Sequence, residues 1–224
     1  MADAFTALNF GKLAILLLAV ALHEAAHAFV ANACGDGTAK ARGRVTLNPI
    51  PHLDPVMSVL LPALLLFSGS PFIFGAGKPV PVVKENLRHP ARDFALIAVA
   101  GPLTNLLQAL IFTGLFVQFG KAGSAELASQ LFRFGIFINI LLAIFNLIPI
   151  PPLDGSRFLA YLLPRPVQSI WYRLDAVGFL VLILLMVWAP PNHWGLENSA
   201  LQQILRSTFE PTWDWWTDTY GGWL

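Results

Sequence analysis

Five apolar segments dominate the sequence and constrain the fold more than any other feature. They span about residues 8–33, 56–74, 93–119, 132–150 and 170–189. An α-helix rises 1.5 Å per residue, so roughly 20 apolar residues are enough to cross the hydrocarbon core of a bilayer. Only 12% of the 224 residues are charged, about half the share found in soluble domains. The sequence predicts an all-α polytopic membrane protein in contact with the lipid bilayer.

The segment 56–74 differs from the other four because it and its edge contain residues that bend or end helices. These residues are Pro62, Gly69, Ser70, Pro71 and Gly75. Such a segment can cross the membrane as a broken helix, or it can dip into the membrane and return as a re-entrant hairpin. The chain therefore has either five crossings or four transmembrane helices plus a hairpin.

The placement of Lys and Arg favours the hairpin. With five crossings, the two sides of the membrane carry 8 and 6 basic residues, which is almost no asymmetry. With a hairpin at 56–74, the loops 33–55, 75–92 and 151–173 share one side and hold 10 of the 14 basic residues. Basic loops remain in the cytoplasm. We therefore expect a multi-pass protein of the cell membrane with its N-terminus outside and these three loops inside.

The two ends of the chain support one membrane domain and a surface tail. VANAC at 30–34 is similar to a signal-peptide cleavage site, but the start lacks basic residues and HEAAH is a poor apolar centre. We expect residues 8–33 to be retained within a membrane-embedded domain at 1–190. Residues 191–224 combine helical spacing with a cluster of tryptophans, which predicts an amphipathic interfacial tail. A net charge of +1 without a basic stripe gives no support to nucleic-acid binding.

A metal-binding pattern lies inside the first apolar segment. His23 and His27 are four residues apart, so on a helix both imidazoles leave one face, with Glu24 beside them as a general base. Ionisable groups at membrane depth are costly and functional by default. Zinc suits imidazole, and a catalytic zinc takes three protein ligands and keeps one position open. The pattern predicts one Zn²⁺ per chain and requires a third ligand.

The best candidate for that third ligand lies at the end of the fourth apolar segment, in FNLIPIPPLDGSR at 145–157. Its three prolines end the helix, and Asp154 followed by Gly155 can turn back toward the metal. In the hairpin topology Asp154 approaches from the side nearer to the histidines. The site then opens toward the cytoplasm, and this geometric reason is independent of the charge count.

A second polar cluster, PHLDP at 51–55, competes for metal. His52 and Asp54 can bind a second ion, or Asp54 can replace Asp154 as ligand. They can also be loop residues that hydrogen-bond around the ligands or form part of a gate. Asn105, one turn beyond Gly101 and Pro102, can hydrogen-bond across helices in the core or to a ligand.

Two short segments beside the hairpin are candidates for holding a substrate. A peptide bond inside a helix is shielded by the helix hydrogen bonds, so a transmembrane substrate must be unwound locally before it is cut. GRVTLNP at 43–49, where Val45 and Leu47 alternate with polar residues, and KPVPVV at 78–83 can form short extended strands at the membrane surface. Either can offer an edge for strand addition. The alternative is that both are connectors pinned by proline.

The two motifs together resemble the site-2 protease family of intramembrane zinc metalloproteases. The resemblance rests on HEAAH at 23–27 and on NLIPIPPLDG at 146–155, and AGPLTN at 100–105 is similar to the start of the family's middle core helix. It covers about residues 8–160. It implies an endopeptidase that cleaves transmembrane segments of regulatory proteins. It also implies residue roles: zinc ligation by His23, His27 and Asp154, proton transfer by Glu24, and contact of Asn146 with the substrate backbone or oxyanion.

Two other functions use the same buried histidines. A metal-binding membrane transporter or sensor would not require Glu24 to take a proton, and a catalytically silent relative would only bind membrane proteins. Glu24 directly after the first histidine, and Asp154 in its proline-framed loop, favour the peptidase.

Overall fold

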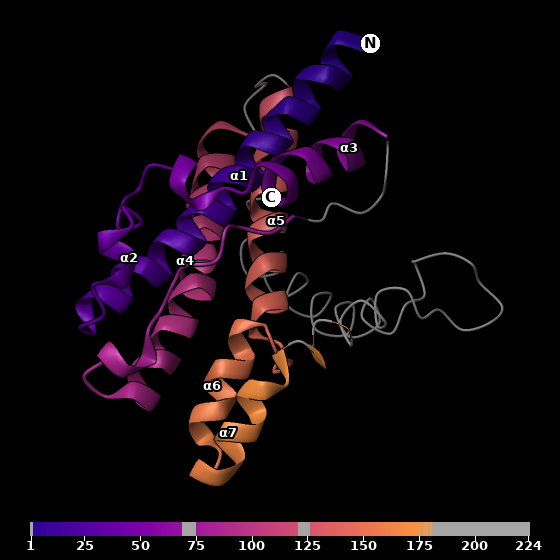
Figure 1. Cartoon of the computed structure of the whole chain (residues 1–224). Helices are drawn as coiled ribbons and strands as arrows, with labels where there is room; N and C mark the ends of the chain where they lie inside the picture. The colour runs from indigo at the N-terminus through magenta and orange to yellow at the C-terminus, as the bar shows by residue number, and fades with distance from the viewer. Residues whose placement is uncertain (1, 69–74, 121–125, 176, 179, 181–224) are drawn as a thin grey trace, which may run out of the picture.

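The structure is a computed structural model that is mostly helical (Figure 1). It describes residues 2–68, 75–120 and 126–175, together with 177, 178 and 180. Within these residues three helices are long and apolar enough to cross a membrane: α1 (Ala2–Ala33), α4 (Pro90–Phe119) and α5 (Glu126–Leu147). They coincide with three of the four predicted crossings. Most of the fourth, at 170–189, and the whole tail at 191–224 lie outside the described residues.

The remaining elements are short. The helices are α2 (Thr38–Ala41), α3 (Leu61–Phe67), α6 (Asp154–Leu162) and α7 (Arg165–Arg173). The tighter or wider helical turns are η1 (Ile50–His52), η2 (Pro55–Leu60, a π-helix) and η3 (Lys84–Asn86).

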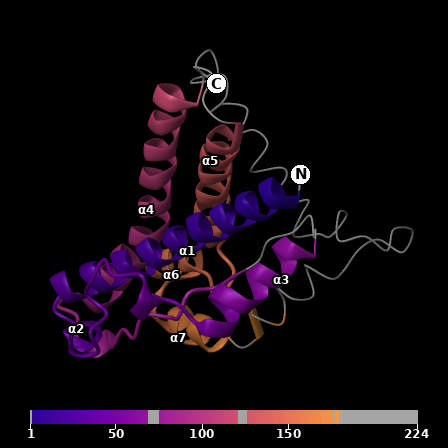
Figure 2. The same cartoon turned by 90° about the horizontal axis from the view of Figure 1, so that it is seen from above.

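The three long helices form a bundle in which α4 packs against both α1 and α5 (Figures 1 and 2). Their directions alternate, so the C-terminal ends of α1 and α5 lie at the same end of the bundle as the start of α4 (Figure 1). Helices α2, α6 and α7 lie at that end too. The bundle therefore gathers the segment after HEAAH and the segment that begins with Asp154 on one side.

Apolar side chains fill the interior of the bundle and also cover its outside. One core cluster joins α4 to α5 through Ala109, Phe116, Ile136 and Ile140, and a second joins α1 to α5. On the outer face of α4, Leu103 and Leu107 are each 57% exposed. Helices that are apolar all round are typical of membrane spans.

The two ends of the predicted hairpin lie side by side. Leu53 and Gly77 form an isolated antiparallel bridge, and the Lys78 N–H donates to the His52 carbonyl at 2.8 Å. Between them, η2 and α3 form an apolar helical stretch over Pro55–Phe67, about 20 Å long and shorter than the bilayer core of about 30 Å. Residues 69–74 of the predicted hairpin lie outside the described residues.

The predicted short strands do not form within the described part of the chain, which corrects that expectation. Residues 43–49 form bends, because Thr46 Oγ1 accepts from the Asn48 N–H and Asn48 Oδ1 accepts from the Ile50 N–H, each at 3.1 Å. Local side-chain bonds of this kind compete with strand pairing. Residues 78–83 are irregular, and two of them are prolines that cannot donate to a ladder.

A buried aspartate fastens the end of α1 to the segment that leads into α4. Asp36 is 0% exposed and accepts hydrogen bonds from Thr38 N–H at 3.0 Å, Val83 N–H at 2.6 Å and Asn86 Nδ2 at 3.1 Å. Burial alone would raise the pKa of this carboxyl, but the hydrogen bonds outweigh burial and the pKa lies below its usual value. The charged form of Asp36 is therefore stabilised by folding.

We expect Asp36→Asn to lower the free energy of unfolding by about 1–3 kcal/mol at pH 7, because the amide cannot accept all of these bonds. A folded-state pKa below the unfolded value of about 3.9 gives stability that is present above that value and is lost as the pH falls through the folded pKa. The difference in thermal midpoint between wild type and variant, measured in detergent, should therefore be large at pH 7 and shrink below about pH 4. Glu85→Gln, at an exposed neighbouring carboxylate, is the control. An equal difference at both pH values would contradict the expectation.

Candidate metal centre

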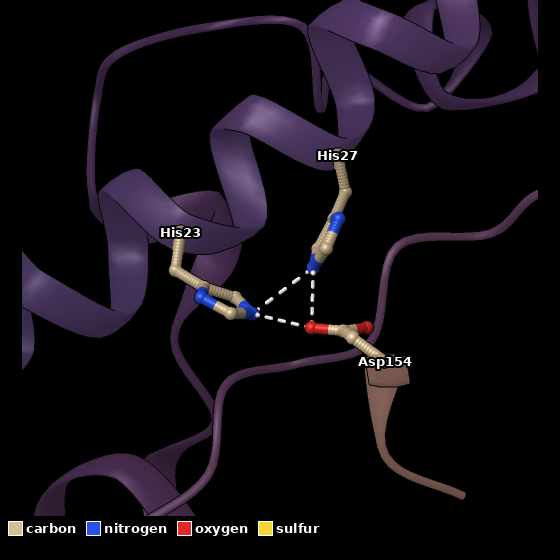
Figure 3. A group of neighbouring side chains, drawn as sticks. All are labelled: His23, His27 and Asp154. Atoms are coloured by element: carbon tan, nitrogen blue, oxygen red, sulfur yellow. Dashed lines mark hydrogen bonds and ion pairs between the residues drawn. The ribbon is translucent and has the colours of Figure 1, made fainter. Parts of the chain in front are cut away.

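Three potential ligand atoms converge where α1 meets the start of α6. His23 Nε2 and His27 Nε2 are 3.0 Å apart, and Asp154 Oδ2 lies 3.1 Å from the first and 3.4 Å from the second (Figure 3). Zinc binds such atoms at about 2.0–2.1 Å, so tetrahedral ligands lie about 3.3 Å from one another. The three separations fit one zinc ion.

Local sequence explains how the three side chains meet. His23 and His27 are one turn apart on α1, so both rings point toward the same neighbour (Figure 3). Helix α5 ends at Leu147, the prolines that follow carry the chain back, and Asp154 is the first residue of α6. Gly155 lets this turn close, because a Cβ there would overlap the Leu147 carbonyl.

Hydrogen bonds on the far side of each ring fix the protonation of both histidines. His27 Nδ1 lies 2.7 Å from the Ile97 carbonyl, and His23 Nδ1 lies 2.5 Å from Asn105 Oδ1. Both oxygens can only accept, so each Nδ1 carries a proton, and in a neutral ring the Nε2 lone pair is then free to bind metal. Two imidazole nitrogens and a carboxylate oxygen that converge in this way can hold a metal ion, and imidazole with carboxylate is a donor set that zinc accepts.

Proline and glycine in α4 make room for this arrangement. Pro102 has no N–H, so the helix lacks the hydrogen bond to the Ala98 carbonyl, which is next in the chain to the Ile97 carbonyl that accepts from His27. Gly101 is buried against both rings, since a Cβ there would lie 2.6 Å from His23 Nε2 and 2.6 Å from His27 Cε1. Both positions belong to the AGPLTN motif.

Gly101→Ala is expected to displace the imidazoles and to weaken zinc binding by about tenfold or more, the scale on which groups around a metal act. Competition with a chelator in detergent measures the affinity. Gly114→Ala is the matched control, because it lies in the same helix and its Cβ would meet nothing within 4 Å. Equal zinc affinities for the two variants would refute the close approach of α4 to the rings.

Glu24 lies beside the ligands in a cavity of about 660 Å³. The cavity is lined by the three ligand residues, by the segment from Gly75 to Val82, and by apolar side chains of α1, α4 and α5. Gly77 passes directly against the glutamate, since a Cβ there would lie 2.8 Å from Glu24 Oε1. The carboxylate, the three candidate ligands and the backbone of the segment that begins at Gly75 thus line one cavity.

The other predicted substrate-binding residues occupy different places. Asn146 lines the cavity, and its Nδ2 donates to the Leu142 carbonyl at 2.9 Å. Val45 is half-buried, Leu47 is 68% exposed, and neither is among the residues that line this cavity. Their contact with substrate stays a prediction.

The competing polar cluster, His52 and Asp54, hydrogen-bonds to the backbone of its own loop. Asp54 Oδ1 accepts from the N–H groups of Val56 and Met57 at 2.9 and 2.8 Å and so caps η2. His52 is buried, and its Nε2 donates to the Thr46 carbonyl at 2.9 Å. Among the described residues, only His23, His27 and Asp154 form a group of three potential metal ligands. The structure brings Asp154, and not Asp54, to the two histidines.

Asn105 and two further residues complete the surroundings of the site. Asn105 Oδ1 lies 2.5 Å from His23 Nδ1, and Asn105 Nδ2 donates to Asn139 Oδ1 at 3.0 Å. Asn139 was detectable only as a polar residue inside the apolar segment 132–150. Arg44 is 5% exposed, and its Nη2 donates to the Lys78 carbonyl at 2.5 Å, which clamps the segment beside Glu24. No signal in the sequence indicates this role, because Arg44 is one of three basic residues in the loop 33–55.

Comparison with known proteins agrees with this geometry. The model of "Peptidase family M50" matches residues 118–187. The chain is 36% identical to "Putative zinc metalloprotease YwhC" of Bacillus subtilis, over 88% of this chain and 91% of the relative. It is 32% identical to "Putative zinc metalloprotease Rip2" of Mycolicibacterium smegmatis, over 81% of this chain and 68% of the relative. No solved structure gives a significant match. The chain therefore belongs to peptidase family M50, the site-2 proteases, and is a multi-pass membrane zinc metalloprotease.

Proposed function

We propose that this protein is an intramembrane zinc endopeptidase that hydrolyses peptide bonds within or near transmembrane segments of membrane-protein substrates. One observation carries the proposal: His23, Glu24 and His27 face one cavity from within an apolar helix, and Asp154 meets them there from the start of α6. His23 is about 15 Å from the end of α1 at Ala33, which is well inside a bilayer crossing. A peptidase site at that depth is suited to substrates that are themselves in the membrane.

The residues divide the chemistry among them. His23, His27 and Asp154 would hold one zinc ion, which supplies Lewis acidity when bound. Glu24 would accept a proton from the attacking water and later deliver it to the leaving amine. Asn146, which also lines the cavity, would donate a hydrogen bond to the substrate backbone or to the oxyanion.

The segment 78–83, together with Gly77 before it, is the better placed of the two candidates for holding an unwound substrate. The Lys78 N–H points to the His52 carbonyl, so in extended backbone the amide groups of Gly77 point the other way. Gly77 lines the cavity and lies against Glu24. A substrate backbone bound against Gly77 would lie beside the general base. Val45 and Leu47 remain second candidates for substrate contact.

The membrane topology that fits this function has four transmembrane helices and a re-entrant hairpin at 56–74. The pairing of Leu53 with Gly77 supports it, because in a fifth crossing these two residues would lie on opposite sides of the bilayer. The basic loops support an outside N-terminus and a site that opens toward the cytoplasm. In this topology substrate enters from the bilayer and products leave near the cytoplasmic surface.

The test is to map the cut in a membrane-embedded substrate. The purified protein is reconstituted in liposomes with two single-span substrates, one a uniform Leu helix and one with Gly and Pro at its centre, and products are identified by mass spectrometry. We expect cleavage inside the apolar segment, faster for the substrate that unwinds easily. Cuts confined to the soluble flanks, or zinc movement across the liposome without any cleavage, would contradict the proposal, and the second outcome would favour a transporter.

A further inference from the structure

A chain of buried hydrogen bonds crosses the bundle from α1 through α4 to α5. His23 Nδ1 donates to Asn105 Oδ1 at 2.5 Å, and Asn105 Nδ2 donates to Asn139 Oδ1 at 3.0 Å. Asn139 Nδ2 in turn donates to the Gly135 carbonyl at 2.9 Å. Both asparagines are 0% exposed. Three helices thus meet in one continuous polar connection that ends on a proposed zinc ligand.

The donors and acceptors along this chain of hydrogen bonds can be arranged in only one direction. The Gly135 carbonyl can only accept, so it binds the NH₂ group of Asn139 and turns the Asn139 oxygen toward Asn105. That oxygen binds the NH₂ group of Asn105 and turns the Asn105 oxygen toward His23. The His23 ring then carries its proton on Nδ1 and presents the lone pair of Nε2 to the ligand group. Each step follows from the donors and acceptors of the side chains.

We infer that Asn139 is a positioning residue of the zinc site: it orients the Asn105 amide and thereby fixes the His23 tautomer that binds metal. The inference rests on the proposed role of His23 as a zinc ligand. If the Asn105 amide rotated by half a turn, its NH₂ group would face His23 Nδ1. The ring would then have to move its proton to Nε2, and the ligand lone pair would be lost.

The surroundings of Asn105 show why Asn139 is needed. Without it, the nearest acceptor for Asn105 Nδ2 among the described residues is the Ala19 carbonyl at 3.4 Å, which Gln108 Nε2 also approaches at 3.4 Å. That contact is long for a hydrogen bond and is shared. His27 needs no such arrangement, because its partner is the Ile97 backbone carbonyl, which cannot exchange donor for acceptor.

The experiment compares zinc affinities of the full-length protein in detergent by competition with a chelator. Asn139→Leu should weaken zinc binding by about 10-fold or more. The double variant Asn105→Asp/Asn139→Leu should recover most of that loss, because a carboxylate offers His23 an acceptor oxygen in either orientation. Asn139→Asp, which keeps an oxygen facing Asn105, should stay near wild type. Ile140→Ala, at the next buried residue of α5, should lower the thermal midpoint without changing the affinity.

The outcomes separate this inference from the zinc site itself. Wild-type affinity in Asn139→Leu, while His27→Ala loses zinc, would overturn the role of Asn139 and leave the ligands in place. Zinc retained in His27→Ala would overturn the ligand assignment instead. If Asn139→Leu does not fold, the inference is tested by Asn139→Asp, and a tenfold loss of zinc affinity in that variant would overturn it. A double variant as weak as Asn139→Leu would mean that Asn139 acts only on packing, which also overturns it.

Discussion

Glu24→Gln is expected to abolish peptide hydrolysis while one zinc ion per chain stays bound. The amide has the size and shape of the carboxylate but cannot take a proton from water, and a positioned general base contributes about 10²–10⁴-fold to the rate. Glu24 is beside the ligand group and not part of it, so the metal should remain. Rates of cleavage of a single-span substrate and zinc content by atomic absorption, measured on the same preparations, give both quantities.

The control for Glu24→Gln is Glu85→Gln, which removes the same charge at an exposed position of η3. It should cleave like wild type. Cleavage by Glu24→Gln within a fewfold of wild type would remove Glu24 from the chemistry. Loss of zinc in this variant would make it a ligand instead of a base.

Asp154→Ala is expected to lose zinc, whereas Asp54→Ala is expected to keep it. Removing one of three protein ligands should weaken binding by more than the 10–100-fold that is typical of groups behind the ligands. Asp54 caps η2 through two backbone N–H groups, so its loss should cost about 0.5–2 kcal/mol of stability and leave the metal in place. Zinc titration and thermal unfolding of both variants check this pair of results.

The pair Asp154→Ala and Asp54→Ala also decides between the two candidate third ligands that the sequence allows. Zinc lost from Asp54→Ala and retained in Asp154→Ala would reverse the assignment. Zinc retained in both would require a ligand from elsewhere in the chain.

The features that could be predicted from the sequence are those that follow from the length of an apolar segment or from the spacing of residues within one segment. Long apolar segments have few alternatives to membrane helices, and α1, α4 and α5 coincide with three of them. His23 and His27 share a helix face by spacing alone. Asp154 could be found because a catalytic zinc needs a third ligand and the prolines before it force the chain to turn.

Features that depend on contacts between distant segments could not be predicted. The close approach of Gly101 to the two imidazoles and of Gly77 to Glu24 leaves no trace in a single sequence beyond a glycine. Asn139 was visible as a polar residue in an apolar segment, but its partner Asn105 is on another helix.

The strand expected at 43–49 failed for a local reason. Alternating polarity predicts a strand, but Thr46 and Asn48 bind the backbone of their own segment and turn it into bends. The polar residues that produced the alternation therefore also prevented the strand.

The most direct test of the central claim is X-ray absorption at the zinc edge of the purified protein. The proposed coordination by His23, His27 and Asp154 predicts two imidazole nitrogens and a carboxylate oxygen around zinc in the wild type, and loss of the zinc edge in His27→Ala. A thiolate ligand, which only Cys34 could supply, or a zinc edge unchanged in His27→Ala, would contradict it.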